Sequence, residues 1–163
     1  MKRQLVLISV AALMLAGCSA SPAPTKVVTP KPTPTVMSVA DAGQLYLKSV
    51  CPTNAAVAAS NSAYQARDLA AIQSTAASLR DLIQSQARIF DDDTILWPAG
   101  ISVDLKVLRD ADLGAASSYD AVSKATSLDI ANGIAFGDQT PASAASQRVR
   151  LRLNLSADTS KGC

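Results

Sequence analysis

Aspartate, lysine, tyrosine and cysteine are the side chains of this sequence that could support acid–base or nucleophilic chemistry. The chain has no histidine, and every one of its 13 acidic residues is an aspartate. The lack of histidine excludes Ser-His-Asp and Cys-His nucleophile systems and most zinc sites. Catalysis by carboxylates would need two aspartates facing each other across a cleft. No pair of aspartates is spaced to indicate such a cleft, so the sequence predicts a non-enzyme with no catalytic residue.

Two groups of aspartates suggest other roles. Asp91-Asp92-Asp93 offers hard oxygen ligands, but a calcium loop of the EF-hand type needs alternating ligands and a closing glutamate. We interpret this run as solvated or helix-capping residues, and we predict no metal and no cofactor. Asp112 interrupts an otherwise apolar helical face. If Asp112 is buried, it needs a polar partner such as an arginine.

The candidate interaction residues are Arg148, Arg150, Arg152 and Trp97. At helical spacing Arg148 and Arg152 share a face and Arg150 points elsewhere, which is typical of cations that favour a helix C-terminus. The alternative for the arginines is contact with an anionic lipid or polymer. Trp97, in a loop before Pro98, either plugs the end of a helical bundle or serves as an interface anchor.

The elements that position these residues follow an export segment. Lys2 and Arg3 precede an apolar stretch, Leu5 to Leu15, which is too short to span a bilayer and has the length of a signal-peptide core. Leu15-Ala16-Gly17-Cys18 resembles the lipobox of bacterial lipoproteins. This resemblance implies cleavage after residue 17 and a lipid on the Cys18 sulfur. We expect residues 1–17 to be a lipoprotein signal peptide and the protein to be anchored on the outer face of the cell membrane.

A linker, residues 18–37, separates the anchor from the rest of the chain. It holds five of the eight prolines, and such a segment favours extended polyproline II over helix or strand. The full chain carries a net charge of +2, so loss of Lys2 and Arg3 would leave the remainder neutral. A neutral chain argues against a nucleic-acid partner.

Residues 38–163 are predicted to form an all-α domain, an up-and-down bundle of three to four helices. Ser38 and Asp68 are expected to cap the first two helices, and Pro52 either kinks the first helix or starts a new one. A helical face of the second helix recurs at spacings of three and four residues: Leu69, Ile72, Ala76, Leu79, Ile83 and Phe90. Further helices are expected at 101–127 and 140–153, with Thr140 as N-cap of the last and a loop marked by Gly133 and Gly137 between them. Short turns between long helices indicate antiparallel neighbours.

Two cysteines remain when Cys18 carries lipid. Cys51 and Cys163 would be an even pair in an oxidising compartment, which favours a disulfide that pins the end of the chain to the first helix. The alternative is a redox-active or partner-linked thiol, although no Cys-x-x-Cys spacing supports it.

Several motifs together resemble a group of small, mostly uncharacterised lipoproteins of high-GC Gram-positive bacteria. The matching residues are the lipobox with its Thr/Pro-rich linker, Tyr46-Leu47, Val50-Cys51-Pro52-Thr53-Asn54, Trp97-Pro98, Arg150-Leu151-Arg152-Leu153-Asn154-Leu155 and Gly162-Cys163. The resemblance implies a Gram-positive cell membrane and supports the Cys51–Cys163 pair. The group has no established activity, so the resemblance supplies no catalytic residue.

We therefore expect a membrane-anchored, non-enzymatic interaction module whose partner is an envelope protein. The alternative is a small-molecule or ion-binding accessory lipoprotein, which would need a pocket between helices lined by tyrosine, Trp97 and a charged side chain.

Overall fold

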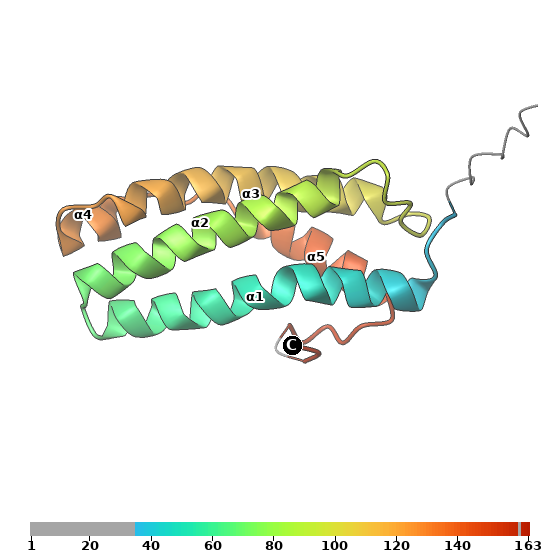
Figure 1. The fold of residues 1–163 in the computed structure, drawn as a ribbon, viewed down its shortest axis with the longest axis horizontal. Coiled ribbons are helices and arrows are strands. Elements are labelled where there is room, and N and C mark those ends of the chain that lie inside the picture. The colour runs from blue at the N-terminus through green and yellow to red at the C-terminus, as the bar shows by residue number, and fades with distance from the viewer. Residues whose placement is uncertain (1–34, 160) are drawn as a thin grey trace, which may run out of the picture. The chain divides into compact units, whose positions relative to one another are not determined.

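All regular structure in the computed structural model, which describes residues 35–159 and 161–163, is helical (Figure 1). The five helices of these residues are α1 (Val39–Gln65), α2 (Leu69–Asp91), α3 (Ser102–Ser123), α4 (Leu128–Gly133) and α5 (Thr140–Arg152). The all-α prediction is confirmed. The predicted signal peptide, Cys18 and nearly all of the linker lie outside the described residues.

Three long helices, α1, α2 and α3, lie side by side and alternate in direction (Figure 1). The short α4 follows α3 at one end of the bundle, and the chain then returns to α5. Helix α5 packs against α3 near the other end, where α1 begins. The last described residues, 153–159 and 161–163, which we call the tail, lie back along α1, so that the C-terminus lies beside the middle of that helix (Figure 1).

The first two helices begin where the sequence predicts. The Ser38 hydroxyl accepts a hydrogen bond from the Asp41 amide at 3.1 Å, and the Asp68 carboxylate accepts one from the Ala71 amide at 3.0 Å. Each bond satisfies an amide that the helix itself leaves without a partner. Helix α1 continues through Pro52, so this proline does not start a new helix.

The later elements differ from the prediction in two places. Helix α3 ends at Ser123, and the segment expected to be a loop contains α4, because the Ser127 hydroxyl caps the Ile130 amide at 3.2 Å. Thr140 is the first residue of α5 rather than its N-cap. The Thr140 amide donates to the Asp138 carboxylate at 2.9 Å, so an aspartate outside the helix takes the role expected of Thr140.

The core forms two clusters. The first cluster joins α1, α2, α3 and α5 through these buried residues: Ala42, Tyr46, Val50, Phe90, Ile101, Leu105, Leu108, Ala145, Val149 and Leu153. The second cluster joins the other ends of α1, α2 and α3 with α4 through Ala63, Ile72, Ala76, Val122, Ala125 and Ala131. We call the part of the bundle around the first cluster the α5 half and the part around the second cluster the α4 half. None of the described helices is long and apolar enough to cross a membrane.

Candidate functional site

The tail reverses direction directly after α5. The Leu155 amide donates to the Arg150 carbonyl at 2.8 Å and the Asn154 amide donates to the Leu151 carbonyl at 3.2 Å. Asn154 has a φ of 55°, in the left-handed region that asparagine tolerates better than most residues and that often ends a helix. This turn sends the tail back toward α1.

Arg150 holds the tail from inside. Its side chain is 1% exposed, and its guanidinium donates to three tail carbonyls: Ser156 at 2.5 Å, Asp158 at 3.0 Å and Lys161 at 2.9 Å. A buried guanidinium is stable when acceptors satisfy its fixed fork of donors. Arg150, predicted as a candidate interaction residue, is therefore not available on the surface, because the tail covers it.

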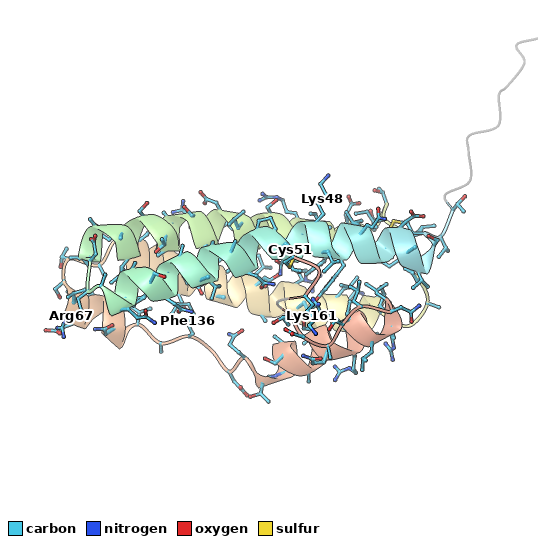
Figure 2. The ribbon with its side chains drawn as sticks, turned by 90° about the horizontal axis from the view of Figure 1, so that it is seen from below. Lys48, Cys51, Arg67, Phe136 and Lys161 are labelled. Carbon is cyan, nitrogen blue, oxygen red and sulfur yellow. A yellow bond between two sulfur atoms is a disulfide. The ribbon has the colours of Figure 1, made fainter. Side chains whose placement is uncertain are left out.

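A disulfide fixes the end of the tail. Cys51 and Cys163 are bonded, with their Cα atoms 5.2 Å apart and a sequence separation of 112 positions. The predicted pair is confirmed. Figure 2, which labels Cys51 and Lys161, shows this last part of the tail against α1. The side chain of Asn54, one turn beyond Cys51, donates to the Thr159 carbonyl at 3.5 Å, so the tail is also tied to α1 by polar contact.

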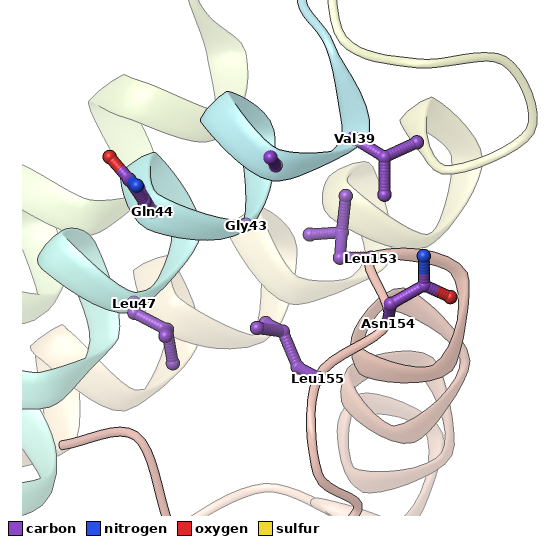
Figure 3. Close-up of a pocket in the computed structure, with 8 residues that line it drawn as sticks. Val39, Gly43, Gln44, Leu47, Leu153, Asn154 and Leu155 are labelled. Atoms are coloured by element: carbon purple, nitrogen blue, oxygen red, sulfur yellow. The ribbon is translucent and has the colours of Figure 1, made fainter.

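An apolar groove of about 440 Å³ lies between the tail and the start of α1 (Figure 3). Helix α1 contributes Val39, Ala40, Gly43, Gln44 and Leu47, and the tail contributes Leu153, Asn154 and Leu155. The aliphatic side chains of Val39, Leu47 and Leu155 border the hollow, and the polar ends of Gln44 and Asn154 lie toward its outside (Figure 3). We call this hollow the tail groove.

A second, polar hollow of about 110 Å³ lies deeper in the α5 half, and we call it the polar crevice. Its polar lining comes from α1, α2, α5 and the tail: Tyr46, Thr53, Asn54, Gln86, Ser146, Arg150 and Thr159. The Tyr46 and Ser146 hydroxyls are 3.0 Å apart and share a hydrogen bond. The Thr53 hydroxyl donates to Gln86 Oε1 at 3.1 Å. Four separate elements thus place hydrogen-bonding groups around one small space.

Asp112 does not line the crevice itself but contacts Gln86, which does. It accepts a hydrogen bond from Gln86 Nε2 at 2.9 Å, and none of the basic side chains in the described residues forms an ion pair with it. Burial raises the pKa of Asp112 to about 7, although the hydrogen bond from Gln86 opposes the rise. The sequence marked Asp112 as an interruption of an apolar face, but its partner is an amide rather than an arginine.

The charges of Arg150 and Asp112 have opposite effects on the pKa of the Tyr46 hydroxyl. Burial raises the pKa of its hydroxyl, while the Ser146 hydroxyl and the Arg150 cation lower that pKa and the Asp112 carboxylate raises it. Arg150 and Asp112 therefore both interact electrostatically with Tyr46, which lines the polar crevice. The sequence pointed to Tyr46 only through the Tyr46-Leu47 motif and the tyrosine expected in the lining of the alternative pocket. It did not point to Ser146 or Gln86; polar side chains on the inner faces of α2 and α5 were the available signal.

The other two arginines of the basic cluster meet one carboxylate. Arg148 Nη2 is 2.7 Å and Arg152 Nη1 is 3.1 Å from Asp104, as expected for residues four apart on one helical face. Asp104 is 5% exposed, and the hydrogen bond from Arg148, followed by that from Arg152, lowers its pKa despite burial. The Arg148 and Arg152 side chains remain about half exposed, so they join α5 to α3 and still reach solvent.

Trp97 packs against the first core cluster. Its ring meets Phe90 edge-on with a centroid distance of 6.4 Å, and Phe90 stacks on Tyr46 at 6.0 Å. The indole Nε1 is buried without a hydrogen-bond partner in the structure. This position matches the bundle-plug interpretation of Trp97 more closely than the interface-anchor interpretation.

The Asp91–Asp93 run is engaged locally. Asp91 pairs with Arg109, and the Asp92 carboxylate accepts from the Thr94 amide at 2.9 Å and the Thr94 hydroxyl at 2.6 Å. Among the described residues, no group of three or more aspartate, glutamate, histidine or cysteine side chains is arranged to hold a metal ion.

The chain matches no family model, and no significant match is found among curated proteins or solved structures. The geometry and charge of the chain itself are therefore the basis for a functional proposal.

Proposed function

We propose that this protein is a membrane-anchored, non-enzymatic interaction module of the cell envelope, and that the tail groove receives an aliphatic segment of an envelope protein. The observation that carries the proposal is the position and lining of the groove. It is an open hollow of about 440 Å³ with mostly aliphatic walls. It lies at the first turns of α1, where the linker from the predicted anchor enters the domain.

The groove is suited to a protein segment because its walls are held firmly. The tail wall is fixed by Arg150 from inside and by the disulfide at its end. A preformed surface loses little conformational freedom on binding, and this favours affinity. Gln44 and Asn154 at the edge can pair with the main chain of a bound segment, as polar groups around an apolar centre do in many interfaces.

The predicted tether favours a partner at the membrane surface. A chain of residues 19–38 in polyproline II, with about 3.1 Å per residue, would keep the groove within some tens of ångströms of the bilayer. Tethering of this kind raises the effective concentration of a membrane-resident partner. The groove residue Val39 is 37% exposed, and Val36, three residues earlier in the chain, is 56% exposed, so this end of the domain presents apolar side chains to solvent.

Photo-crosslinking in cells tests the proposal. A photoreactive amino acid replaces Gln44 at the groove, and a matched variant carries it at Ala59, which is exposed on the same helix in the α4 half. We expect the Gln44 variant to form one main adduct, mapped by mass spectrometry to an aliphatic extracytoplasmic segment of a membrane-resident protein. Val39→Asp, which places a charge in the groove, and Cys18→Ser, which removes the predicted lipid site, should each abolish the adduct.

Three results would overturn this function: adducts with lipid alone, the same adducts from Gln44 and Ala59, or no adduct from either position. An adduct that survives Val39→Asp would show that the partner binds elsewhere on the domain.

A further inference from the structure

The polar crevice differs from the tail groove in its chemistry, and it is independent of the proposed interaction with a protein. Its lining includes Tyr46, Gln86, Ser146 and Arg150, whose side chains carry hydroxyl, amide and guanidinium groups. In the structure these groups bond to one another, to Asp112 or to the tail, so a molecule that enters the crevice has to form hydrogen bonds in exchange for those it displaces. A volume of about 110 Å³ accommodates about four waters or a molecule of about five heavy atoms.

The crevice adjoins a wider hollow. This hollow, of about 250 Å³ on the α3, α5 and tail side, shares Leu108, Ser146 and Thr159 with the crevice. In the proposal below, it is the route from solvent to the Tyr46–Ser146 pair. The tail supplies Thr159 to both hollows, and the disulfide four residues later fixes that wall.

The charges near the crevice have opposite signs. Arg150 lines it directly and carries a buried positive charge. Asp112 lies behind Gln86 and, within the described residues, has no cation beside it to offset its charge. Both act on the Tyr46 hydroxyl, which itself lines the crevice. Arg150 repels a simple cation and attracts a carboxylate, and the Asp112 carboxylate, where it is ionised, favours a ligand that also carries an ammonium group over a simple anion.

We propose that the polar crevice binds a small zwitterion of amino-acid size, with its carboxylate toward Arg150 and its ammonium group toward Gln86 and Asp112. The Tyr46 and Ser146 hydroxyls, which bond to each other when the crevice holds no ligand, would turn to the bound molecule. Because a ligand of about five heavy atoms makes few contacts, we expect dissociation constants in the high-micromolar to millimolar range.

Calorimetric titration of the full-length protein in lipid nanodiscs tests this site. The probes are glycine, ethanolamine, which carries the ammonium group alone, and acetate, which carries the carboxylate alone. We expect saturable binding of glycine at one site, with ethanolamine and acetate at least tenfold weaker. Asp112→Asn and Tyr46→Phe should each weaken glycine binding at least tenfold.

The matched control is Asp129→Asn, which changes an exposed aspartate of α4 in the other half of the bundle and should leave glycine binding unchanged. Absence of saturable glycine binding to the wild-type protein would overturn the proposal. Equal affinity for glycine and ethanolamine would overturn the zwitterion assignment, and retained binding in Tyr46→Phe would remove the crevice as the site. Each result is separable from the photo-crosslinking at Gln44, because the groove and the crevice share no lining residue.

Discussion

The α5 half and the α4 half of the bundle are built from the same three long helices, but they are stabilised differently. The first core cluster contains Tyr46, Phe90 and several leucines, and Trp97 packs against it. Four of the six buried residues of the second cluster are alanines. Burial of an alanine removes little apolar area from water, whereas an aromatic ring removes much more.

The polar and covalent contacts are distributed in the same way. The buried Arg150, the Arg148–Asp104–Arg152 group and the disulfide all lie in the α5 half. The ion pairs of the described α4 half, Arg80–Asp81, Arg80–Asp120 and Lys124–Asp120, involve partly or largely exposed side chains, and pairs of this type contribute little to stability. Both candidate sites lie where the tail is fixed, so the firm half of the bundle is also the half with sites.

The largest expected effect on stability comes from removing the disulfide, which would reduce the difference in stability between the α5 half and the α4 half. The double variant Cys51→Ser, Cys163→Ser frees a loop of 112 residues, and the free energy of unfolding should fall by about 4–5 kcal/mol because the unfolded chain gains freedom. Urea unfolding measures the change, and hydrogen exchange should show the loss of protection in the tail. Reduction of the wild-type protein by a dithiol is the matched control. A decrease below about 1 kcal/mol would show that Arg150 alone holds the tail.

The next effect depends on pH and tests Asp112, a partly buried carboxylate of the α5 half. The pKa of Asp112 is raised from 3.8 to about 7 in the fold, so the folded state binds a proton more strongly than the unfolded state between these values. The contribution of Asp112 to stability is present below pH 4 and is lost as the pH rises toward 7. Asp112→Asn should remove this loss and raise the free energy of unfolding at pH 8 by at most about 4 kcal/mol.

Urea unfolding at pH 5 and pH 8 measures this difference between variant and wild type. Asp129→Asn on α4 serves as control and should show the same pH dependence as the wild type. A gain for Asp112→Asn that is equal at both pH values would contradict the assignment of the raised pKa to Asp112.

The smallest expected effect on stability comes from a substitution in the α4 half. Ile72 is fully buried in the second cluster, and Ile72→Val removes one methylene group, which should cost about 1 kcal/mol. Native-state hydrogen exchange should place this loss in α4 and the adjoining ends of α2 and α3, with the amides near Leu105 unaffected. Equal loss of protection around Leu105 would show that the two clusters unfold as one unit.

The regular parts of the fold were predictable because they depend on short-range patterns. The apolar spacing of α2 and the caps at Ser38 and Asp68 each act within a few residues. Ser127 caps α4 by the same kind of hydrogen bond. Because α4 has only six residues, it is too short to show a repeated apolar spacing, and the sequence did not predict it. The Asp138 carboxylate, rather than the Thr140 side chain, accepts a hydrogen bond from the first amide of α5. The Thr140-Pro141 pair predicted Thr140 as the capping residue and did not indicate Asp138.

The sites were less predictable because they depend on the path of the tail. Arg150 donates to backbone carbonyls of Ser156, Asp158 and Lys161, and every residue has a carbonyl, so side-chain identity does not mark these partners. The tail groove exists only after the chain turns at Asn154. Asp112 was visible as a polar interruption, whereas its neighbours Gln86 and Tyr46 become a common wall only in three dimensions.

The disulfide also determines how the domain would carry mechanical tension. If a partner in the tail groove pulls against the proposed membrane anchor, the force acts on the first turn of α1 and on the tail at Leu155. From there the covalent route to the anchor runs through Cys163 to Cys51 and back along the first part of α1. Helices α2 to α5 lie inside the closed loop and outside this route. The connection between partner and membrane would therefore persist even if the α4 half opened under load.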